Sequence, residues 1–201
     1  MIQLGEISKA EAARYMGIRT APDEKTAELL DRYEKIVRSR LMPAYVWRES
    51  QLTFSTEGVY LSGLSVPLTG KSIQKLLTGC ERAVVLAATV SAAADSLIRQ
   101  AAVSDMAGAV VADALCSAAI EQVCDIAETE IFGDMLRENR TYRFSPGYGD
   151  LPIELQKNLL DFLNAQRRIG LSCTDSHMLT PTKSVTAIIG VKAVREYCST
   201  N

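Results

Sequence analysis

The chain has 201 residues, of which 47% are hydrophobic, and its formal net charge is −2 at pH 7. A chain of this size and composition can bury one sizeable core, so we expect a single domain over residues 1–201 with an N-terminal helical region over about 1–43. Its charges are interspersed without a basic block, which excludes the electrostatic footprint of a nucleic-acid-binding protein.

Membrane insertion and disulfide bonding are not indicated. No uninterrupted apolar stretch approaches the roughly 18 to 20 residues of a membrane span, and the N-terminus lacks the pattern of a signal peptide. We therefore expect a cytoplasmic protein. The cysteines are odd in number and form no Cys-x-x-Cys pair, which predicts reduced thiols without a metal site: Cys80, Cys116, Cys124, Cys173 and Cys198.

Two helices are predicted in the first 43 residues. Ser8 and Glu11 have the spacing of a capping box, so a short helix is expected over about 8–16. Over 24–42, apolar residues recur at helical spacing, which predicts a surface helix that ends before Pro43.

The next segments favour strands. Residues 45–54 and 58–61 are rich in β-forming residues and flank a turn-like Ser-Thr-Glu-Gly, which predicts a hairpin. The apolar run over 83–90 is β-branched at its centre and fits a buried strand, although periodicity alone does not exclude a helix.

The alanine-rich stretch over 91–136 predicts two helices with a joint near Ser104-Asp105. Small residues such as Ala112 and Ala119 let the second helix lie close to a neighbouring element. We expect this second helix to be the central buried helix of the domain.

The C-terminal part mixes a loop, a helix and strands. An amphipathic helix is expected over 151–168, with Asp150 as its N-cap and Pro152 in its first turn. Strands are expected over 172–178 and 184–191. Because strands and helices follow no repeating βαβ order, the fold class is predicted as α+β, with an antiparallel or mixed sheet packed with helices.

Two motifs suggest ligand chemistry but are incomplete. Gly70-Lys71-Ser72 resembles the end of a phosphate-binding loop, but the first glycine of that motif is replaced by Ser65, so a plain helix start is favoured. Asp175 and His177 match the start of the Asp-x-His-x-x-Gly motif of corrinoid-binding proteins, but Thr180 replaces its glycine. We interpret His177 as a side chain at a strand end.

Common enzyme signatures are also missing. The chain has one histidine and no Gly-x-Ser-x-Gly elbow, which disfavours a hydrolase. No Gly-x-Gly-x-x-Gly follows a predicted strand, which disfavours a Rossmann-type methyltransferase or dehydrogenase.

The most informative segment is Arg143-Phe-Ser-Pro-Gly-Tyr-Gly-Asp-Leu-Pro152. It places a guanidinium, two glycines and an aromatic ring in one loop. An arginine can hold a carboxylate by two parallel hydrogen bonds, and glycines let a ligand approach the main chain. The alternative is a tight turn with a packed tyrosine.

This loop, followed by Cys-Thr-Asp-Ser-x-Met-Leu-x-Pro over 173–181 and by Ser184-Val185, resembles the activation domain of vitamin B12-dependent methionine synthase. The helix over 105–121 and the Leu-Leu-x-Gly-Cys of 76–80 are also similar to that family, so the likeness extends over nearly the whole chain.

The resemblance implies a defined chemistry. In this family the domain binds S-adenosylmethionine and presents its methyl group to cob(II)alamin, while flavodoxin or a similar carrier supplies an electron. The chain would then act as an accessory subunit of the methyltransferase, without catalytic or metal-binding residues of its own. Cobalamin would come only through a partner, a corrinoid-binding methionine synthase or a related corrinoid protein.

The ligand loop of the family corresponds to Arg143, Ser145, Gly147 and Tyr148. The resemblance implies that Arg143 binds the methionine carboxylate, that the main chain at Ser145 and Gly147 contacts the ligand, and that Tyr148 shapes the pocket.

Two positions depart from the family pattern. Ser117 lies near the place of a ligand-binding acid, with Glu121 one turn later, and Ile189 stands where an aromatic contact is expected. A ligand-sensing or scaffold protein without reactivation activity, and an independent small-molecule enzyme, therefore remain as alternatives.

Overall fold

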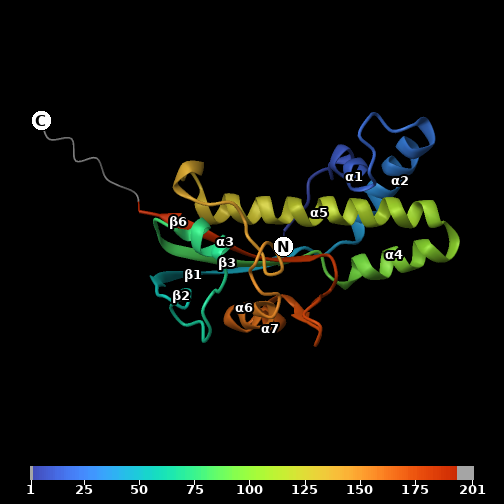
Figure 1. Cartoon of the computed structure of the whole chain (residues 1–201). Coiled ribbons are helices and arrows are strands. Elements are labelled where there is room, and N and C mark those ends of the chain that lie inside the picture. Colours follow the sequence, from blue (N-terminus) through green and yellow to red (C-terminus); the bar gives the residue numbers. More distant parts are fainter. Residues whose placement is uncertain (1, 194–201) are drawn as a thin grey trace, which may run out of the picture.

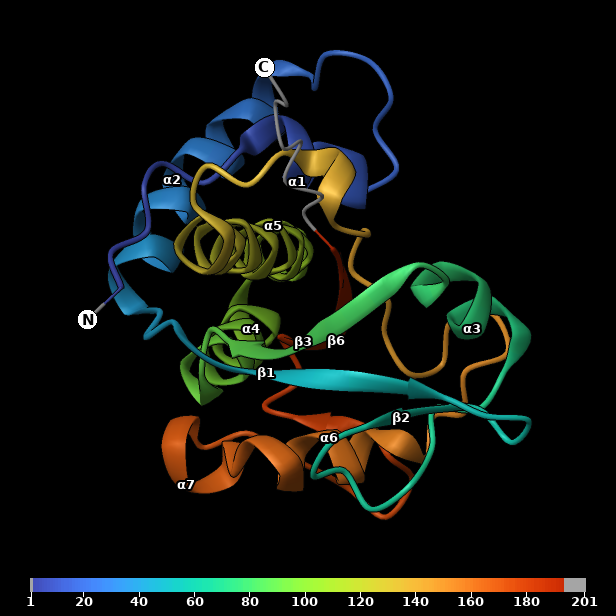
Figure 2. The ribbon, with the colours of Figure 1, turned by 90° about the vertical axis from the view of Figure 1, so that its left-hand side faces the viewer.

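The computed structural model describes residues 2–193 and is built in three layers (Figure 1). A four-stranded sheet forms the middle layer. Helices α1, α2 and α5 lie on one face of the sheet, α6 and α7 lie on the other, and α4 packs against α5 beyond one end of the strands (Figures 1 and 2). Cys198 lies outside the described residues.

The sheet has the order β2-β1-β3-β6, and each neighbouring pair is antiparallel. Its strands are β1 (Ala44–Phe54), β2 (Val59–Leu61), β3 (Cys80–Thr89) and β6 (Ser184–Lys192). The predicted α+β class and the hairpin are thus confirmed. The run over 83–90 is a strand because β3 is central: Val85 belongs to the core on one face and Ala88 to the core on the other, and both are fully buried.

The N-terminal helices begin at side-chain caps, of which that at Ser8 was predicted. In α1 (Lys9–Tyr15) the Ser8 hydroxyl accepts a hydrogen bond from the Glu11 N–H at 3.2 Å, while the Glu11 carboxylate pairs with Arg14. In α2 (Glu24–Arg40) the Asp23 carboxylate accepts from the Thr26 N–H at 2.7 Å. Both helices pack on α5.

The predicted joint between two helices is confirmed. Helix α4 (Ala92–Ser104) ends where Asp105 caps α5 (Met106–Phe132), its carboxylate accepting from the Gly108 N–H at 2.9 Å. By length and composition alone α5 could cross a membrane, but 67% of its most apolar window is buried inside the protein. Most of its circumference is apolar because the sheet and three helices pack against it.

The remaining elements are short. Helix α3 (Lys71–Leu77) follows Gly70, as expected for a plain helix start. A 3₁₀ turn spans Arg137–Asn139. Two short strands, β4 (Ser172–Cys173) and β5 (Leu179–Thr180), pair with each other beside α6.

The prediction of a single helix over 151–168 is wrong. This segment is divided into α6 (Leu155–Leu163) and α7 (Ala165–Ile169), because Asn164 adopts a left-handed conformation with φ 52°. Asp150 does not cap it. The Asp150 carboxylate instead accepts from the N–H groups of Lys71 and Ser72, at 2.7 and 2.9 Å, and so caps α3.

The strand predicted over 172–178 is also wrong. Only Ser172 and Cys173 are extended, and a turn over 174–177 is closed by a hydrogen bond from the His177 N–H to the Thr174 carbonyl at 2.9 Å. His177 has φ 63°, so it lies within the turn and not at a strand end. The strand after this turn is β5.

Candidate functional site

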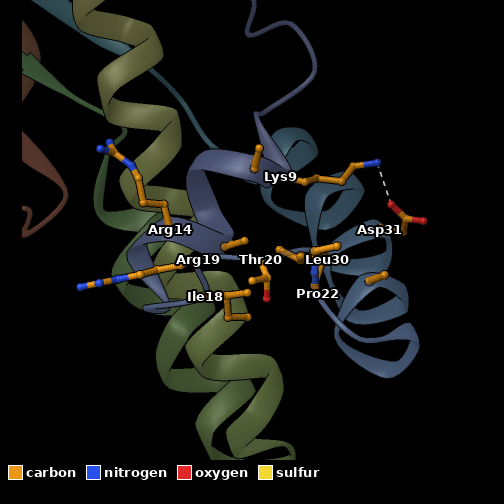
Figure 3. A pocket seen from close by; sticks show the side chains of 12 residues that line it. Lys9, Arg14, Ile18, Arg19, Thr20, Pro22, Leu30 and Asp31 are labelled. Atoms are coloured by element: carbon orange, nitrogen blue, oxygen red, sulfur yellow. Dashed lines mark hydrogen bonds and ion pairs between the residues drawn. The ribbon is translucent and has the colours of Figure 1, made fainter.

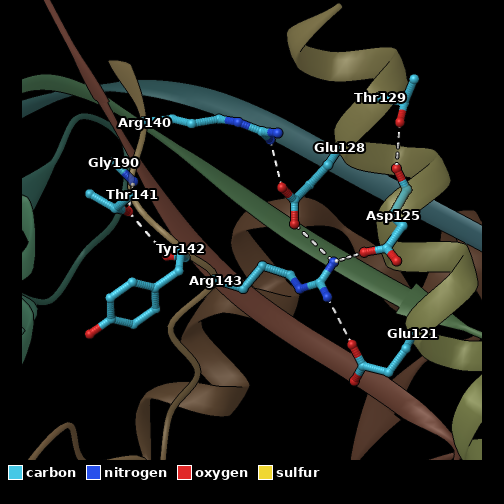
Figure 4. A network of polar contacts seen from close by, with 9 residues as sticks. All are labelled: Glu121, Asp125, Glu128, Thr129, Arg140, Thr141, Tyr142, Arg143 and Gly190. Atoms are coloured by element: carbon cyan, nitrogen blue, oxygen red, sulfur yellow. Dashed lines mark hydrogen bonds and ion pairs between the residues drawn. The ribbon is translucent and has the colours of Figure 1, made fainter. Parts of the chain in front are cut away.

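The loop that carries Arg143 runs along the free edge of β6. Arg140 and Phe144 form isolated bridges with Val191 and Ile188. The side chain of Arg143 thereby points across this edge toward the last turns of α5 (Figure 4). The loop, which follows α5 after one 3₁₀ turn, thus folds back on that helix, and the two build one polar site.

Arg143 is held by three carboxylates of α5 (Figure 4). Its Nη1 donates to Asp125 at 3.0 Å and to Glu128 at 2.8 Å, and its Nη2 donates to Glu121 at 2.8 Å. The acids are four and three residues apart, so they share one face of the helix. The side chain of Arg143 is 23% exposed, which places the guanidinium at the floor of the site.

Arg140 supports this arrangement from below. It pairs with Glu128 at 2.5 Å, and its guanidinium lies 4.5 Å from the ring centroid of Phe132. The Glu128 side chain is only 14% exposed, and it forms ion pairs with both Arg140 and Arg143. Burial raises the pKa of the neighbouring Cys124 thiol to about 12, so this thiol is neutral beneath the network.

Cavities open on both sides of Asp125. One of about 530 Å³ lies between α1 and α5 and is lined by Glu6, Ser8, Glu11, Arg14, Tyr15, Ala118, Glu121, Gln122 and Asp125. The other, of about 250 Å³, lies between α5 and the loop and is lined by Asp125, Glu128, Arg137, Arg140, Thr141, Tyr142 and Arg143. We call these two cavities together the acidic cleft.

Two exposed tyrosines accompany the cleft. Tyr15 of α1 is 48% exposed and Tyr148 of the loop is 66% exposed. Partial burial raises the pKa of Tyr15, and Glu121 adds to the shift, with a smaller contribution from Tyr148. The three groups therefore lie within electrostatic reach of one another, and aromatic faces are available beside the carboxylates.

The other loop residues are engaged with one another. The Gly147 N–H donates to the Leu151 carbonyl at 2.9 Å, and the Tyr148 N–H donates to the Ser145 carbonyl at 3.2 Å. Gly147 has φ 88°, a conformation that favours glycine. Ser145, Gly147 and Tyr148 therefore lie in one closed turn, in which the N–H groups of Gly147 and Tyr148 are already used.

The family model described as "Vitamin B12 dependent methionine synthase, activation domain" matches residues 77–200. The chain belongs to this family. The matched part contains α5 and the Arg143 loop, and the family resemblance predicted from the loop motif is confirmed.

A solved structure supports the fold of this activation domain. The structure titled "Crystal Structure of the MetH Reactivation Domain bound to AdoHcy" aligns with a TM-score of 0.63 and 17% sequence identity, over 96% of this chain and 69% of that chain. At this identity the likeness establishes a shared fold. A search of curated proteins gave no match.

The two departures from the family pattern have different surroundings. Ser117 of this activation domain lies one turn before Glu121 on α5, where its hydroxyl donates to the Asp113 carbonyl at 3.0 Å and accepts from Lys183 at 2.9 Å. Ile189 is fully buried in a small core with Val84 and Phe132. Its side chain is therefore a core element between sheet and helix.

The two incomplete motifs lie away from the acidic cleft. At Gly70-Lys71-Ser72 the helix N-terminus already holds the Asp150 carboxylate, and a Cβ at Gly70 would lie 2.6 Å from the Asp150 carbonyl oxygen. His177 lines a cavity of about 330 Å³ beside α6 and α7. Among residues 2–193 no cluster of three metal-ligating side chains occurs.

A further cavity of about 580 Å³ lies between α1 and α2 (Figure 3). Ile18, Pro22 and Leu30 line it with small apolar residues, and a hydrogen bond of 2.6 Å between Lys9 and Asp31 spans one side. Arg14 lines both this cavity and the acidic cleft.

Sequence reasoning missed most of the acidic cleft. Glu121 was singled out, but Asp125 and Glu128 were not connected with Arg143. Their regular spacing on one face of an otherwise apolar helix is a signal that could have indicated a polar site. No local signal shows that Glu11 and Tyr15 lie opposite these acids.

Proposed function

We propose that this activation domain binds S-adenosylmethionine in the acidic cleft and presents its methyl group to the cob(II)alamin of a corrinoid-dependent methionine synthase. The observation that carries the proposal is the Arg143 loop lying against the acids of α5 beside two exposed tyrosines. Membership of the activation-domain family supports it, as does a fold shared with a reactivation domain whose structure is titled as bound to AdoHcy.

The cleft offers groups for each part of this ligand. The bonds from Arg143 to α5 use three of the five N–H groups of a guanidinium, which leaves two for the methionine carboxylate. Glu121 and Asp125 provide acceptors for the ammonium group. The rings of Tyr15 and Tyr148 offer faces to the adenine or to the sulfonium.

The expected role of the chain is presentation. The methyl group moves from the sulfonium to the cobalt of the partner, and a flavodoxin-like donor supplies the electron that this reductive step consumes. The chain would contribute orientation and proximity and needs no acid or base. It would thus be an accessory subunit of a methyltransferase in methionine biosynthesis.

The surface beside the cleft supports docking of a corrinoid protein. Leu136, Tyr142 and Tyr148 are all more than 60% exposed, and Tyr142 and Phe144 form an aromatic pair with ring centroids 6.3 Å apart. We propose that the partner covers this surface when its cobalt approaches the methyl group.

Calorimetric titration with S-adenosylmethionine tests the proposal. Arg143→Ala is expected to weaken binding by about 10- to 100-fold, because hydrogen bonds to charged groups contribute about 1.5–3 kcal/mol. Arg143→Lys keeps the charge but loses the planar fork and should weaken binding less. Arg167→Ala, on the opposite face of the sheet, is the control.

Circular dichroism of each variant shows whether the fold survives loss of the ion pairs. No binding by the unmodified protein would contradict the proposal. Binding that Arg143→Ala leaves unchanged would contradict the role of Arg143.

The alternative is a ligand-sensing or scaffold protein that keeps the fold without reactivation activity. The observation in its favour is that Ser117 and Ile189 serve internal contacts and core packing. Reactivation of a partner's cob(II)alamin, followed by its absorption spectrum with S-adenosylmethionine and a reductant, separates the two. Ligand binding without methylcobalamin formation would favour the alternative.

A further inference from the structure

We infer that Arg137 binds the carboxylate of S-adenosylmethionine in the smaller cavity of the acidic cleft. This inference rests on the proposed function, because it concerns the same ligand and the same cleft. It assigns a specificity-determining role to an arginine that precedes the Arg143 loop and lies outside its motif.

A short turn places Arg137 at this cavity. Helix α5 ends at Phe132, and the 3₁₀ turn Arg137–Asn139 joins it to the loop that carries Arg143. The Arg140 N–H donates to the Arg137 carbonyl at 3.4 Å and so closes the turn. Three arginines, at positions 137, 140 and 143, thereby line one cavity of about 250 Å³.

Two of these arginines are already held by the protein itself (Figure 4). Arg140 pairs with Glu128 and lies over the ring of Phe132. Arg143 donates three hydrogen bonds to carboxylates of α5, which leaves at most two of its five N–H groups for a ligand.

Arg137 differs from both in its surroundings. Its side chain is exposed, and within residues 2–193 it forms no ion pair. The planar fork of a guanidinium can bind a carboxylate through two parallel hydrogen bonds, provided that its N–H groups are not engaged elsewhere. Arg137 therefore offers the complete fork that Arg143 lacks.

The sizes of the two cavities indicate which end of the ligand meets Arg137. Pockets for drug-sized ligands typically have about 300–1,000 Å³. The smaller cavity, of about 250 Å³, suits the amino-acid end of the ligand, and the larger one, of about 530 Å³, suits the adenosine. Asp125 lines both cavities, so its carboxylate can accept from the ammonium group while the carboxylate of the ligand lies between Arg137 and Arg143.

The test is a calorimetric titration of the full chain with S-adenosylmethionine and with its decarboxylated form. The second ligand keeps the sulfonium, the ammonium and the adenosine and lacks only the carboxylate. Arg137→Ala should weaken binding of S-adenosylmethionine by about five- to tenfold, between the contribution of an exposed ion pair and that of a hydrogen bond to a charged group. It should leave the affinity for the decarboxylated ligand unchanged.

Two further variants define the effect. Arg137→Lys keeps the charge without the planar fork and should weaken binding of S-adenosylmethionine less than Arg137→Ala. Arg168→Ala removes another exposed arginine, in α7 on the opposite face of the sheet, and should change neither affinity.

Equal weakening of both ligands by Arg137→Ala would overturn the inference, because Arg137 would then act through the shape of the cavity and not on the carboxylate. An unchanged affinity for S-adenosylmethionine would also overturn it and would leave the proposed function intact. If the unmodified protein does not bind S-adenosylmethionine, the proposed function fails and the inference fails with it. Because Arg137 is exposed, Arg137→Ala should fold, and its melting curve checks this.

Discussion

Asp150 caps a helix that is distant in the sequence and not the helix that follows it. It precedes a predicted helix, but its carboxylate binds the first N–H groups of α3, which begins 79 residues earlier in the sequence. The hydrogen bonds from Ser72 and then from Lys71 lower the pKa of Asp150. The stabilisation by its charged form is therefore complete above the pKa of the unfolded chain and is lost as the pH falls through the lower folded pKa.

Asp150→Asn should reduce the free energy of unfolding at pH 7 and at pH 5 by similar amounts. Below about pH 3.8 the difference from the unmodified protein should decrease, because Asp150 of the unfolded chain takes up a proton there while the folded protein, with its lower pKa, does so only at lower pH. Urea denaturation at pH 7, 5 and 3.5 measures this. Asp134→Asn, an exposed position after α5, is the control. A difference that does not change with pH would contradict the assignment.

At the scale of elements, α5 is shaped by what it packs against. Gly108 lies in its first turn, where the N-terminus of α5 meets Tyr33 of α2. A Cβ at this position would lie 2.1 Å from the Tyr33 hydroxyl oxygen and 2.4 Å from Cζ. Helix propensity alone favours alanine over glycine by about 1 kcal/mol, so propensity and packing predict opposite signs.

Gly108→Ala should destabilise the protein by about 1–3 kcal/mol, because overpacking a buried site outweighs the gain in propensity. The free energy of unfolding in urea gives the sign directly. Ala107→Gly, at the exposed neighbouring position, should cost about 0.5–1 kcal/mol through propensity alone. A more stable Gly108→Ala variant would show that Tyr33 moves aside without cost.

For the whole molecule, the sheet separates the two larger cores. One lies between the sheet, α5 and the N-terminal helices, and the other lies between the sheet, α6 and α3. Leu30, Tyr33 and Val37 of α2 belong to the first core, so the N-terminal region covers α5 and is not an appendage. The prediction of one domain over 1–201 stays a prediction.

Removal of residues 1–43 should therefore expose the apolar surface of α5 and prevent a stable monomer. We expect the shortened chain to aggregate or to bind a hydrophobic dye strongly, because large exposed apolar patches promote association. Size-exclusion chromatography and dye fluorescence measure this against the full chain. A shortened chain that is monomeric and unfolds cooperatively would show that the N-terminal region is a separate unit.

Local patterns determined a large part of this protein. The periodicity over 24–42, the strand-forming runs and the joint at Asp105 predicted most elements and the α+β class, because these signals depend on residues close in sequence. The Arg143 loop, a short motif of unusual composition, was sufficient to indicate the family.

The tertiary structure alone decided which elements meet. It placed Asp150 on α3 and Tyr15 beside Glu121, pairs separated by 79 and by more than 100 positions. It also brought Asp125 and Glu128 to Arg143, a contact that the sequence alone did not predict. Such contacts depend on how the helices pack on the sheet, and the periodicity of a single segment carries no information about the partner it will meet.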